Sequence, residues 1–366
     1  MALTIVAKIG SSSLTDERGE IDTAAIRRLC LEVAALRSDG HRVLVVTSGA
    51  VAGGVAALGL GGNRPTDTIT LQALSAVGQS RLMQVYNEIL GELGLVGAQV
   101  LLTSYDFIHR SQYLHARQTL QRLLELECVP VINENDAIAD DEIRFGDNDR
   151  IAALVAHLVS ADVLVLLTDT HGLFTADPRT DPTARLVPYV DDLGALDVVV
   201  GGSGTSRGSG GMASKLAAAR IASWSGVRAV IAKADRPHVL RDAAHDVEGV
   251  GTVFEARDRR LPSRKLWIAF AISPTGRVVV DDGARRAIVE RNTSLLPAGI
   301  RRVEGEFAEG DAIEIVGLDG VVIARGLAAV DHQVARRNTG RRTTELPDGE
   351  NHEVVHRDDL VVLVAP

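Results

Sequence analysis

Short, strongly apolar segments alternate with helical patterns along the first two thirds of the chain, and this alternation constrains the fold most tightly. Helical patterns run from Asp22 to near Gly40, through the 50s, and from about Thr68 to Leu93. The apolar segments have the length of buried strands and lie at residues 3–9, 43–47, 98–102, 129–132, 163–167 and 229–232. Because parallel neighbours need a helical crossover, the pattern predicts an α/β fold, a three-layer αβα sandwich with a mostly parallel open sheet. Active sites in such sheets collect at the carboxyl ends of the strands.

The character of the chain changes after residue 255. Residues 256–263 are dense in charge and contain Pro262, which is typical of a linker. The segment beyond predicts one helix near Ala284–Arg291 and short strands at residues 278–280, 312–316, 321–324 and 360–364. Since 366 residues suffice for two domains, we expect a larger domain over residues 1–255 and a small β-rich domain over residues 264–366.

The charge of the chain argues against a polyanionic partner. A net charge of −9 gives the protein as a whole no electrostatic attraction for nucleic acid or an anionic membrane. The apolar run at residues 3–7 ends too soon for a signal peptide, and no apolar stretch has the length of a membrane span. Cys30 and Cys128 lack metal-type spacing and indicate two ordinary buried thiols in a reducing compartment. We therefore expect a cytoplasmic protein that acts on small molecules.

Lysine is scarce, and the positions that retain it are informative. Only four of the 39 basic residues are lysines, at positions 8, 215, 233 and 265. Lysine is a compact, flexible point charge, which suits a moving phosphoryl group better than a planar guanidinium does. Lys8 and Lys215 both lie beside glycine-rich turns, so they are the candidates for such a role.

Two turns of small residues follow the first two predicted strands. Lys8-Ile9-Gly10-Ser11 leads from the first strand into a serine-rich loop, and Ser48-Gly49-Ala50 follows the second strand. Free backbone N–H groups beside a lysine can cradle a phosphate, and neighbouring strands would direct both turns into one crevice. The alternative is that each is a plain strand-to-helix connection.

Carboxylates and carboxamides gather after the strand at residues 129–132. The first group is Asn133-Glu134-Asn135-Asp136, and the second is Phe145-Gly146-Asp147-Asn148-Asp149, which runs into an apolar helix pattern. Asp147 or Asn148 alone would be explained as a helix N-cap. Capping does not explain the whole set, so we expect a substrate-binding cluster.

Two further segments are candidates for nucleotide binding. Thr168-Asp169 ends a buried strand, where aspartate is also a common turn former. The glycine-rich segment 201–215 opens an alanine-rich helix, but it matches neither a Walker A loop nor a dinucleotide fingerprint. Its free amides and the helix N-terminus still suit a polyphosphate, with a flexible surface loop as the alternative.

Taken together, these motifs resemble those of the amino acid kinase superfamily, and within it those of the glutamate 5-kinases. The resemblance rests on Ser-Gly-Ala-Val, Asn-Glu-Asn-Asp, Phe-Gly-Asp-Asn-Asp, Thr-Asp-x-x-Gly-Leu-Phe and Gly-Gly-Met-x-Ser-Lys, in this order after the Lys8 loop. The segments Asp281–Ala284 and Ser294–Ile300 are similar to the PUA domain that many such bacterial enzymes carry. Ser209 and Ser214 stand where the family often has threonine, and both keep the hydroxyl group.

The resemblance implies ATP-dependent phosphorylation of the γ-carboxylate of L-glutamate to L-glutamyl 5-phosphate, the first step of proline biosynthesis. It implies that Lys8 and Lys215 contact the phosphoryl group from opposite sides and that Asp149 holds these lysines. It places the amino acid on Ser48, Gly49, Ala50, Asn135, Asp136 and Asn148. It places ATP on Lys8, Gly10, Ser11, Thr168, Asp169, Ser209, Gly210, Gly211, Met212, Ala213, Ser214 and Lys215. Mg²⁺ is the expected counter-charge of the phosphates, without assigned protein ligands.

The resemblance also suggests L-proline as a feedback inhibitor, a glutamyl phosphate reductase as a partner, and a homo-oligomer. One alternative is another carboxylate kinase of the superfamily, or a carbamate or uridylate kinase. A second is RNA binding through the PUA domain, where Arg336-Arg337 and Arg341-Arg342 form a basic cluster. Residues 261–366, however, contain 14 lysines and arginines against 16 acidic residues, which offers little attraction for RNA.

Overall fold

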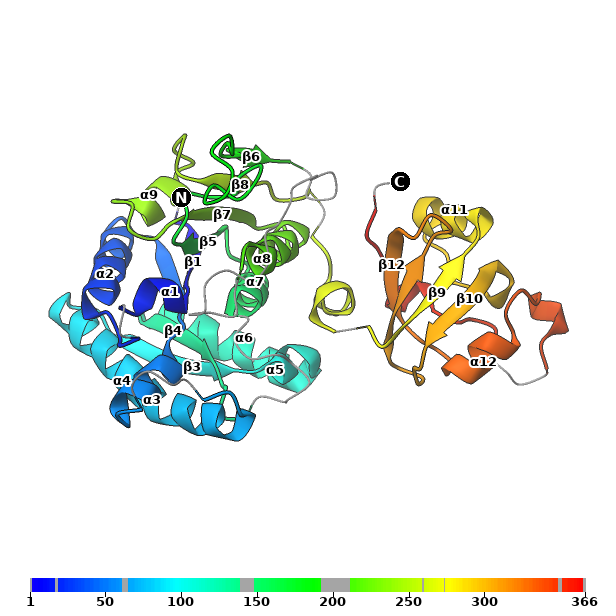
Figure 1. Cartoon of the computed structure of the whole chain (residues 1–366), viewed down its shortest axis with the longest axis horizontal. Helices are drawn as coiled ribbons and strands as arrows, with labels where there is room; N and C mark the ends of the chain where they lie inside the picture. The colour runs from blue at the N-terminus through cyan, green and yellow to red at the C-terminus, as the bar shows by residue number, and fades with distance from the viewer. Residues whose placement is uncertain are drawn as a thin grey trace. The chain divides into compact units, whose positions relative to one another are not determined.

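The chain forms two compact units, Met1–Arg260 and Leu261–Pro366, in a computed structural model (Figure 1). The structure describes residues 2–16, 19–60, 65–138, 148–191, 211–258, 260–272, 274–347 and 351–364. The division between the units falls inside the segment 256–263 that the sequence indicates as a linker. Each unit has a hydrophobic core of its own.

The first unit is built on an eight-stranded sheet. In sheet order its strands are β3 (Gly97–Leu102), β4 (Val129–Glu134), β2 (Arg42–Val46), β1 (Thr4–Ile9), β5 (Val163–Thr168), β7 (Arg228–Lys233), β8 (Thr252–Phe254) and β6 (Tyr189–Val190). The strands from β3 to β7 are parallel, whereas β8 pairs with β7 in the antiparallel sense. The central strands β1, β4 and β5 are buried along their whole length, as expected for parallel strands covered on both faces.

The register of the central strands brings their carboxyl ends to one edge. In β1, Lys8 pairs with Val46 of β2 on one side and with Leu166 of β5 on the other. The turns that leave β1, β2 and β5 therefore start at nearly the same level of the sheet. This edge holds the candidate site.

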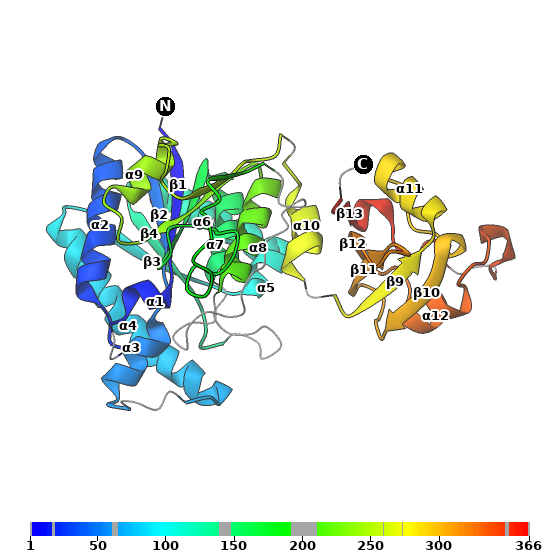
Figure 2. The same cartoon turned by 45° about the horizontal axis from the view of Figure 1, so that its top comes forward.

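Helices cover both faces of this sheet (Figure 2). One face carries α2 (Thr23–Ser38), α4 (Thr68–Glu92) and α9 (Val239–Ala244), whose apolar side chains share a core with β1 and β5. The other face carries α6 (Arg110–Glu125), α7 (Asn148–Val159) and α8 (Met212–Trp224). Further helices of this unit are α1 (Ser11–Leu14), α3 (Ala50–Ala57) and α5 (Ser104–Ile108).

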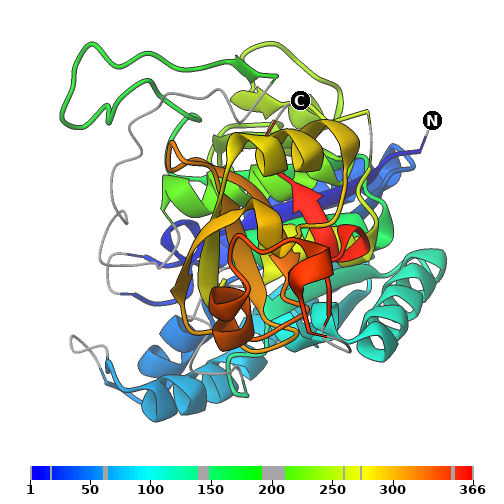
Figure 3. The same cartoon turned by 90° about the vertical axis from the view of Figure 1, so that its right-hand side faces the viewer.

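The second unit contains a five-stranded sheet in the order β10-β9-β11-β12-β13. Its strands are β9 (Gly276–Val280), β10 (Ile300–Gly305), β11 (Ala312–Val316), β12 (Val322–Leu327) and β13 (Leu360–Val362). Its helical segments are α10 (Ser263–Leu266), the π-turn η1 (Trp267–Ala271), α11 (Asp282–Arg291), α12 (His332–Arg337) and the short 3₁₀ turns η2 (Pro297–Gly299), η3 (Thr343–Glu345) and η4 (Arg357–Asp359). Helix α11 packs against β12 and α12 against β10 (Figure 3).

The predicted three-layer α/β architecture and the β-rich second unit are confirmed, but some details differ. Residues 11–14 after β1 form one helical turn, because Ser13 N bonds to Gly10 O and Thr15 N bonds to Ser11 O. Cys30 is buried as expected, whereas Cys128 is partly exposed beyond the end of α6. Within the described ranges, no helix combines the length and apolar character required to cross a membrane.

Candidate active site

Two lysines from distant parts of the sequence meet at one carboxylate. Lys8 Nζ lies 2.6 Å from Asp149 Oδ1, and Lys215 Nζ lies 3.2 Å from Asp149 Oδ2. Ser214 Oγ donates a third contact to Asp149 Oδ2 at 2.6 Å. Lys8 comes from β1, Asp149 from the first turn of α7, and Lys215 from the first turn of α8. The structure thus brings together the three residues that the sequence indicates for catalysis.

The side chains of Lys8, Asp149 and Lys215 are buried. Lys8, Asp149 and Lys215 are 4%, 1% and 5% exposed. Burial acts to raise the pKa of Asp149, but the charges of Lys8 and then Lys215 outweigh it and lower the pKa to about 2. Asp149 is therefore a carboxylate at neutral pH, and two positive groups face one negative group. The surplus positive charge, reinforced by the N-termini of α7 and α8, suits an anionic phosphoryl group.

The loop after β1 is arranged around the ammonium group of Lys8. A Cβ atom at Gly10 would lie 3.5 Å from Lys8 Nζ, which is van der Waals contact, so the backbone of this loop passes close to the ammonium group. Ser11 begins the helical turn α1 and is only partly exposed. The serine loop therefore starts directly beside the lysine.

The glycine-rich segment is described from Gly211 onward. Gly211 is the N-cap of α8, and Met212, Ala213, Ser214 and Lys215 form its first turn. Ser209 and Gly210, also predicted to bind ATP, lie outside the described residues.

A second polar cluster lies at the carboxyl ends of β2 and β4. Asn148 Nδ2 donates to Ser48 Oγ and to Asn133 Oδ1, both at 3.1 Å. Glu134 N donates to Asn133 Oδ1 at 2.9 Å and to Asn148 Oδ1 at 3.2 Å. All four residues are buried, so the cluster is a fixed set of amides and a hydroxyl group.

The remaining residues predicted to bind the amino acid surround this cluster. Asp136 is 8% exposed, and its Oδ2 accepts from Ser75 Oγ of α4 at 3.0 Å. Asn135 is bonded through its backbone, since its N–H donates to Leu102 O. Gly49 has a φ of 106°, a left-handed conformation that favours glycine, and it caps α3, which starts at Ala50.

Thr168 and Asp169 end β5 on the other side of β1. Thr168 is buried, Asp169 is exposed, and the hydroxyl group of Thr168 donates to Asp169 Oδ1 at 3.0 Å. Both residues line a cavity of about 580 Å³ that also borders Ser12 and Lys233. This cavity lies at the carboxyl ends of β1, β5 and β7, the edge at which ligands bind in parallel sheets.

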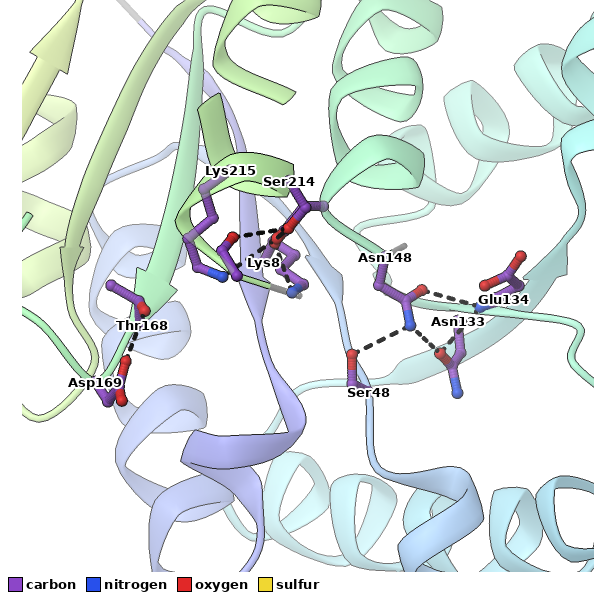
Figure 4. A network of polar contacts seen from close by, with 11 residues as sticks. Lys8, Ser48, Asn133, Glu134, Asn148, Thr168, Asp169, Ser214 and Lys215 are labelled. Carbon is purple, nitrogen blue, oxygen red and sulfur yellow. Dashed lines mark hydrogen bonds and ion pairs between the residues drawn. The ribbon is translucent and has the colours of Figure 1, made fainter. Parts of the chain in front are cut away.

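The site has three groups of residues, and they follow the order of the strands: the amide cluster, the lysine pair with Asp149, and the Thr168-Asp169 turn. Because the sheet runs β4-β2-β1-β5, Lys8 on β1 lies between the amide cluster and the Thr168-Asp169 turn. In the view of Figure 4, Lys8 and Lys215 lie between Thr168 on one side and Asn148 on the other. Asn148 and Asp149 are consecutive in α7, yet one joins the amide cluster and the other joins the lysines. The start of α7 therefore connects the two halves of the site.

Sequence reasoning missed two residues of this site, Ser75 and Gln79 of α4. Gln79 Oε1 accepts from Asn133 Nδ2 at 2.8 Å, and Ser75 holds Asp136. Both fall in a segment for which the sequence predicts only a helix. The available signal was a pair of polar residues, four positions apart, among the apolar positions of that helix.

Matches to known proteins cover nearly the whole chain. Residues 3–233 match the model of the Amino acid kinase family, and residues 276–348 match that of the PUA domain. The chain belongs to the amino acid kinase family. The glutamate 5-kinase of Frankia casuarinae is 47% identical over 369 residues, covering 99% of this chain and 97% of that protein. The glutamate 5-kinase of Nocardia farcinica is 45% identical over 360 residues, covering 98% of this chain and 97% of that protein.

The match to the amino acid kinase family includes the whole candidate site, because β1, α7, β5 and the start of α8 all lie within residues 3–233. The family assignment and the PUA domain predicted from the motifs are both confirmed. The roles of the individual residues remain predictions.

Proposed function

We propose that this member of the amino acid kinase family transfers the γ-phosphoryl group of ATP to the γ-carboxylate of L-glutamate. The products would be ADP and L-glutamyl 5-phosphate. The proposal is supported by near full-length relatives that bear the name glutamate 5-kinase. The structural observation that carries it is the pair Lys8 and Lys215, which converge on Asp149 beside the amide cluster. A cavity of about 580 Å³ at the ends of β1, β5 and β7 is the proposed site of the nucleotide.

The reaction needs positioning and charge neutralisation rather than a general base. A γ-carboxylate has an ordinary pKa of about 4.3, so it is already ionised at neutral pH. Two anions must approach each other, and the charge on the transferred group must be stabilised. The buried ammonium groups of Lys8 and Lys215 supply that stabilisation without rearrangement, because Asp149 holds them in place.

Each half of the site then has a role. Asp136 would pair with the ammonium group of the amino acid, while Ser48 and Asn148 would orient it, together with the Gly49-Ala50 turn and Asn135. Thr168 and Asp169 would bind ATP, together with Gly10, Ser11 and the segment 209–215. A carboxylate oxygen of glutamate attacks the γ-phosphorus atom from the amide-cluster side, and ADP leaves towards the cavity.

Mg²⁺ is proposed to enter as the counter-ion of ATP. Among the described residues, no group of three or more His, Cys, Asp or Glu side chains could hold a metal ion. Asp149, the most buried carboxylate of the site, is already engaged by two lysines. The phosphates themselves fit Mg²⁺, which commonly keeps waters and few protein ligands.

The decisive assay combines purified protein, ATP, Mg²⁺ and L-glutamate with hydroxylamine, which traps an acyl phosphate as a hydroxamate. We expect glutamate-dependent hydroxamate and an equal amount of ADP. The same assay with acetylglutamate, aspartate, carbamate and uridylate tests the other activities of related kinases, with ADP as the readout for acceptors that give no hydroxamate. A higher kcat/KM for any of these acceptors would overturn the choice of glutamate.

The proposed pathway role adds further expectations. As the first enzyme of proline biosynthesis in the cytoplasm, the protein should be inhibited by L-proline. If kinase activity does not fall when L-proline is titrated into the assay, the proposal of feedback inhibition is wrong. We also propose a homo-oligomer and transfer of the labile product to a glutamyl phosphate reductase. A reductase that fails to raise the yield of reduced product over free diffusion would count against this transfer.

A further inference from the structure

Helix α4 contributes two polar side chains, Ser75 and Gln79, that contact residues of the proposed amino acid site. Ser75 and Gln79 lie one turn apart and are 3% and 8% exposed. Ser75 Oγ donates to Asp136 Oδ2 at 3.0 Å, and Gln79 Oε1 accepts from Asn133 Nδ2 at 2.8 Å. This helix therefore forms the wall behind two residues of the proposed amino acid site.

Close backbone packing fixes that wall relative to the turn that starts α3. A Cβ atom at Gly78 would lie 1.8 Å from Ala50 O, and one at Gly54 would lie 2.0 Å from Leu74 O. Only glycine permits this approach of α3 and α4. Gln79 follows Gly78 directly, so its position relative to the Ser48-Gly49-Ala50 turn is tightly set.

The hydrogen-bond network determines which way the Gln79 amide faces. Asn133 Oδ1 accepts from Glu134 N and from Asn148 Nδ2, so the other amide atom of Asn133 must be the donor nitrogen. Gln79 meets that donor with its oxygen, which leaves its nitrogen to face elsewhere. Within the described part of the chain, the buried Gln79 Nε2 has no hydrogen-bond acceptor.

A buried amide nitrogen without an acceptor is unfavourable, and such groups usually have a partner. We propose that the partner of Gln79 Nε2 is the α-carboxylate of the acceptor amino acid, which makes Gln79 a substrate-binding and specificity-determining residue. This inference rests on the proposed function and adds a ligand to it.

The α-carboxylate is favoured over the γ-carboxylate by the arrangement of α4. In an α-amino acid the ammonium group and the α-carboxylate share one carbon atom, so their binding groups must be neighbours. Asp136, the proposed partner of the ammonium group, is held by Ser75, and Gln79 follows one turn later, about 6 Å along the helix. The γ-carboxylate must instead reach the lysine pair at Asp149.

The test compares Gln79→Glu and Gln79→Met with the wild-type full-length chain. Glu keeps an oxygen for Asn133 but replaces the donor with a negatively charged oxygen, whereas Met has similar length and neither polar group. Gln84→Glu is the matched control, since it adds the same charge to the exposed side of α4. We expect the KM for glutamate to rise about tenfold in Gln79→Met and up to about a hundredfold in Gln79→Glu, with the KM for ATP within about twofold of wild type.

A substrate analogue separates direct binding from misplacement of Asn133. The inhibition constant of 4-aminobutanoate, which lacks the α-carboxylate, should change less than about threefold in both Gln79 variants. Equal losses for glutamate and 4-aminobutanoate, or an unchanged KM in a thermally stable Gln79→Glu protein, would overturn the inference alone. A wild-type protein that gives no glutamyl hydroxamate would overturn the proposed function as well.

Discussion

At the scale of single residues, the carboxylate of Asp149 forms ion pairs with both Lys8 and Lys215. Its pKa of about 2 means that the carboxyl group stays ionised throughout the physiological pH range. Because the folded pKa lies below the ordinary value of 3.8, the stabilisation is present above that value and is lost only as the pH falls towards 2. Asp149 therefore keeps its negative charge beside both ammonium groups over this range.

Replacing either lysine should damage turnover more than binding. We expect Lys8→Met and Lys215→Met each to lower kcat about a hundredfold or more, because each removes one preorganised donor to the transferred phosphoryl group. Steady-state kinetics with glutamate as the varied substrate provide the measurement. Lys265→Met, in the second unit, is the control and should leave kcat unchanged. A kcat within about tenfold of wild type for both site variants would contradict the proposed roles.

His157 should make stability depend on pH in the acid range. It is 4% exposed within α7, and burial, followed by the charges of Arg260 and Arg117, lowers its pKa from 6.5 to about 4. Between these two values the unfolded chain binds the proton and the folded chain does not, so acidification favours unfolding. From about pH 7.5 to about pH 5, His157 should lower the free energy of unfolding by about 2 kcal/mol.

The measurement for His157 uses denaturant unfolding followed by Trp224 fluorescence. A Trp267→Phe background removes the second tryptophan, which lies in the other unit. The His157→Gln variant should be less sensitive to pH by about 2 kcal/mol over this range, whatever its absolute stability. Identical pH slopes for the two proteins would refute the prediction.

Residue types that the chemistry needs were visible in the sequence, but their partners were not. Lys8 and Lys215 stood out because lysine is scarce, and Asp149 followed from its motif. The polar pair Ser75 and Gln79 could be seen in the sequence, but the proposed role of Gln79 could not, because it depends on an amide network among β4, α7 and α4 that local periodicity does not encode. Glutamine in a long helix has no special meaning until its neighbours in space are known.

At the scale of elements, the crossing of α3 and α4 should be the packing feature least tolerant of change. A Gly78→Ala substitution would place a methyl group 1.8 Å from Ala50 O, which forces the two helices apart. We expect a loss of at least about 2 kcal/mol in the free energy of unfolding. The KM for glutamate should also rise, because Ala50 belongs to the turn that starts at Ser48.

Gly91→Ala is the matched control for this crossing, since it lies in the same helix and, apart from the adjacent residues and backbone of that helix, no atom lies within 4 Å of its added Cβ. Alanine there should increase stability by about 0.5–1 kcal/mol through its higher helix propensity. Thermal melts and glutamate titrations of both variants provide the data. Equal effects of the two substitutions would show that helix propensity, rather than close packing, governs the response.

The central strands were predictable because each is a run of apolar residues that is buried on both faces, as in residues 163–167. The edge strand β6, with only two residues, carried no such signal. The turn at residues 11–14 was expected to be a loop, since serine has little helix preference, and its helical geometry comes from local backbone bonds after Gly10.

At the scale of the whole molecule, the chain has two units with separate cores, and the proposed site lies in the first of them. All described residues of the proposed site belong to the unit Met1–Arg260, whose core contains β1, β5 and helices α2 and α4. The second unit has a separate core built on β9–β13. The sequence predicts a boundary at residues 256–263, because the strands become short and the turns frequent after this segment.

A chain that ends after Arg260 should therefore fold and phosphorylate glutamate. Arg260 itself must be kept, because its guanidinium group donates to His157 O at the end of α7. We expect kcat within about tenfold of the full-length protein, measured by hydroxamate formation, and a thermal transition close to that of the first unit in the intact chain. The matched control is the truncated Lys215→Met protein, whose kcat should be about a hundredfold or more lower while its circular dichroism spectrum is unchanged. A folded truncated chain without activity would mean that the second unit contributes directly to catalysis, and an unfolded one would mean that the first core is insufficient alone.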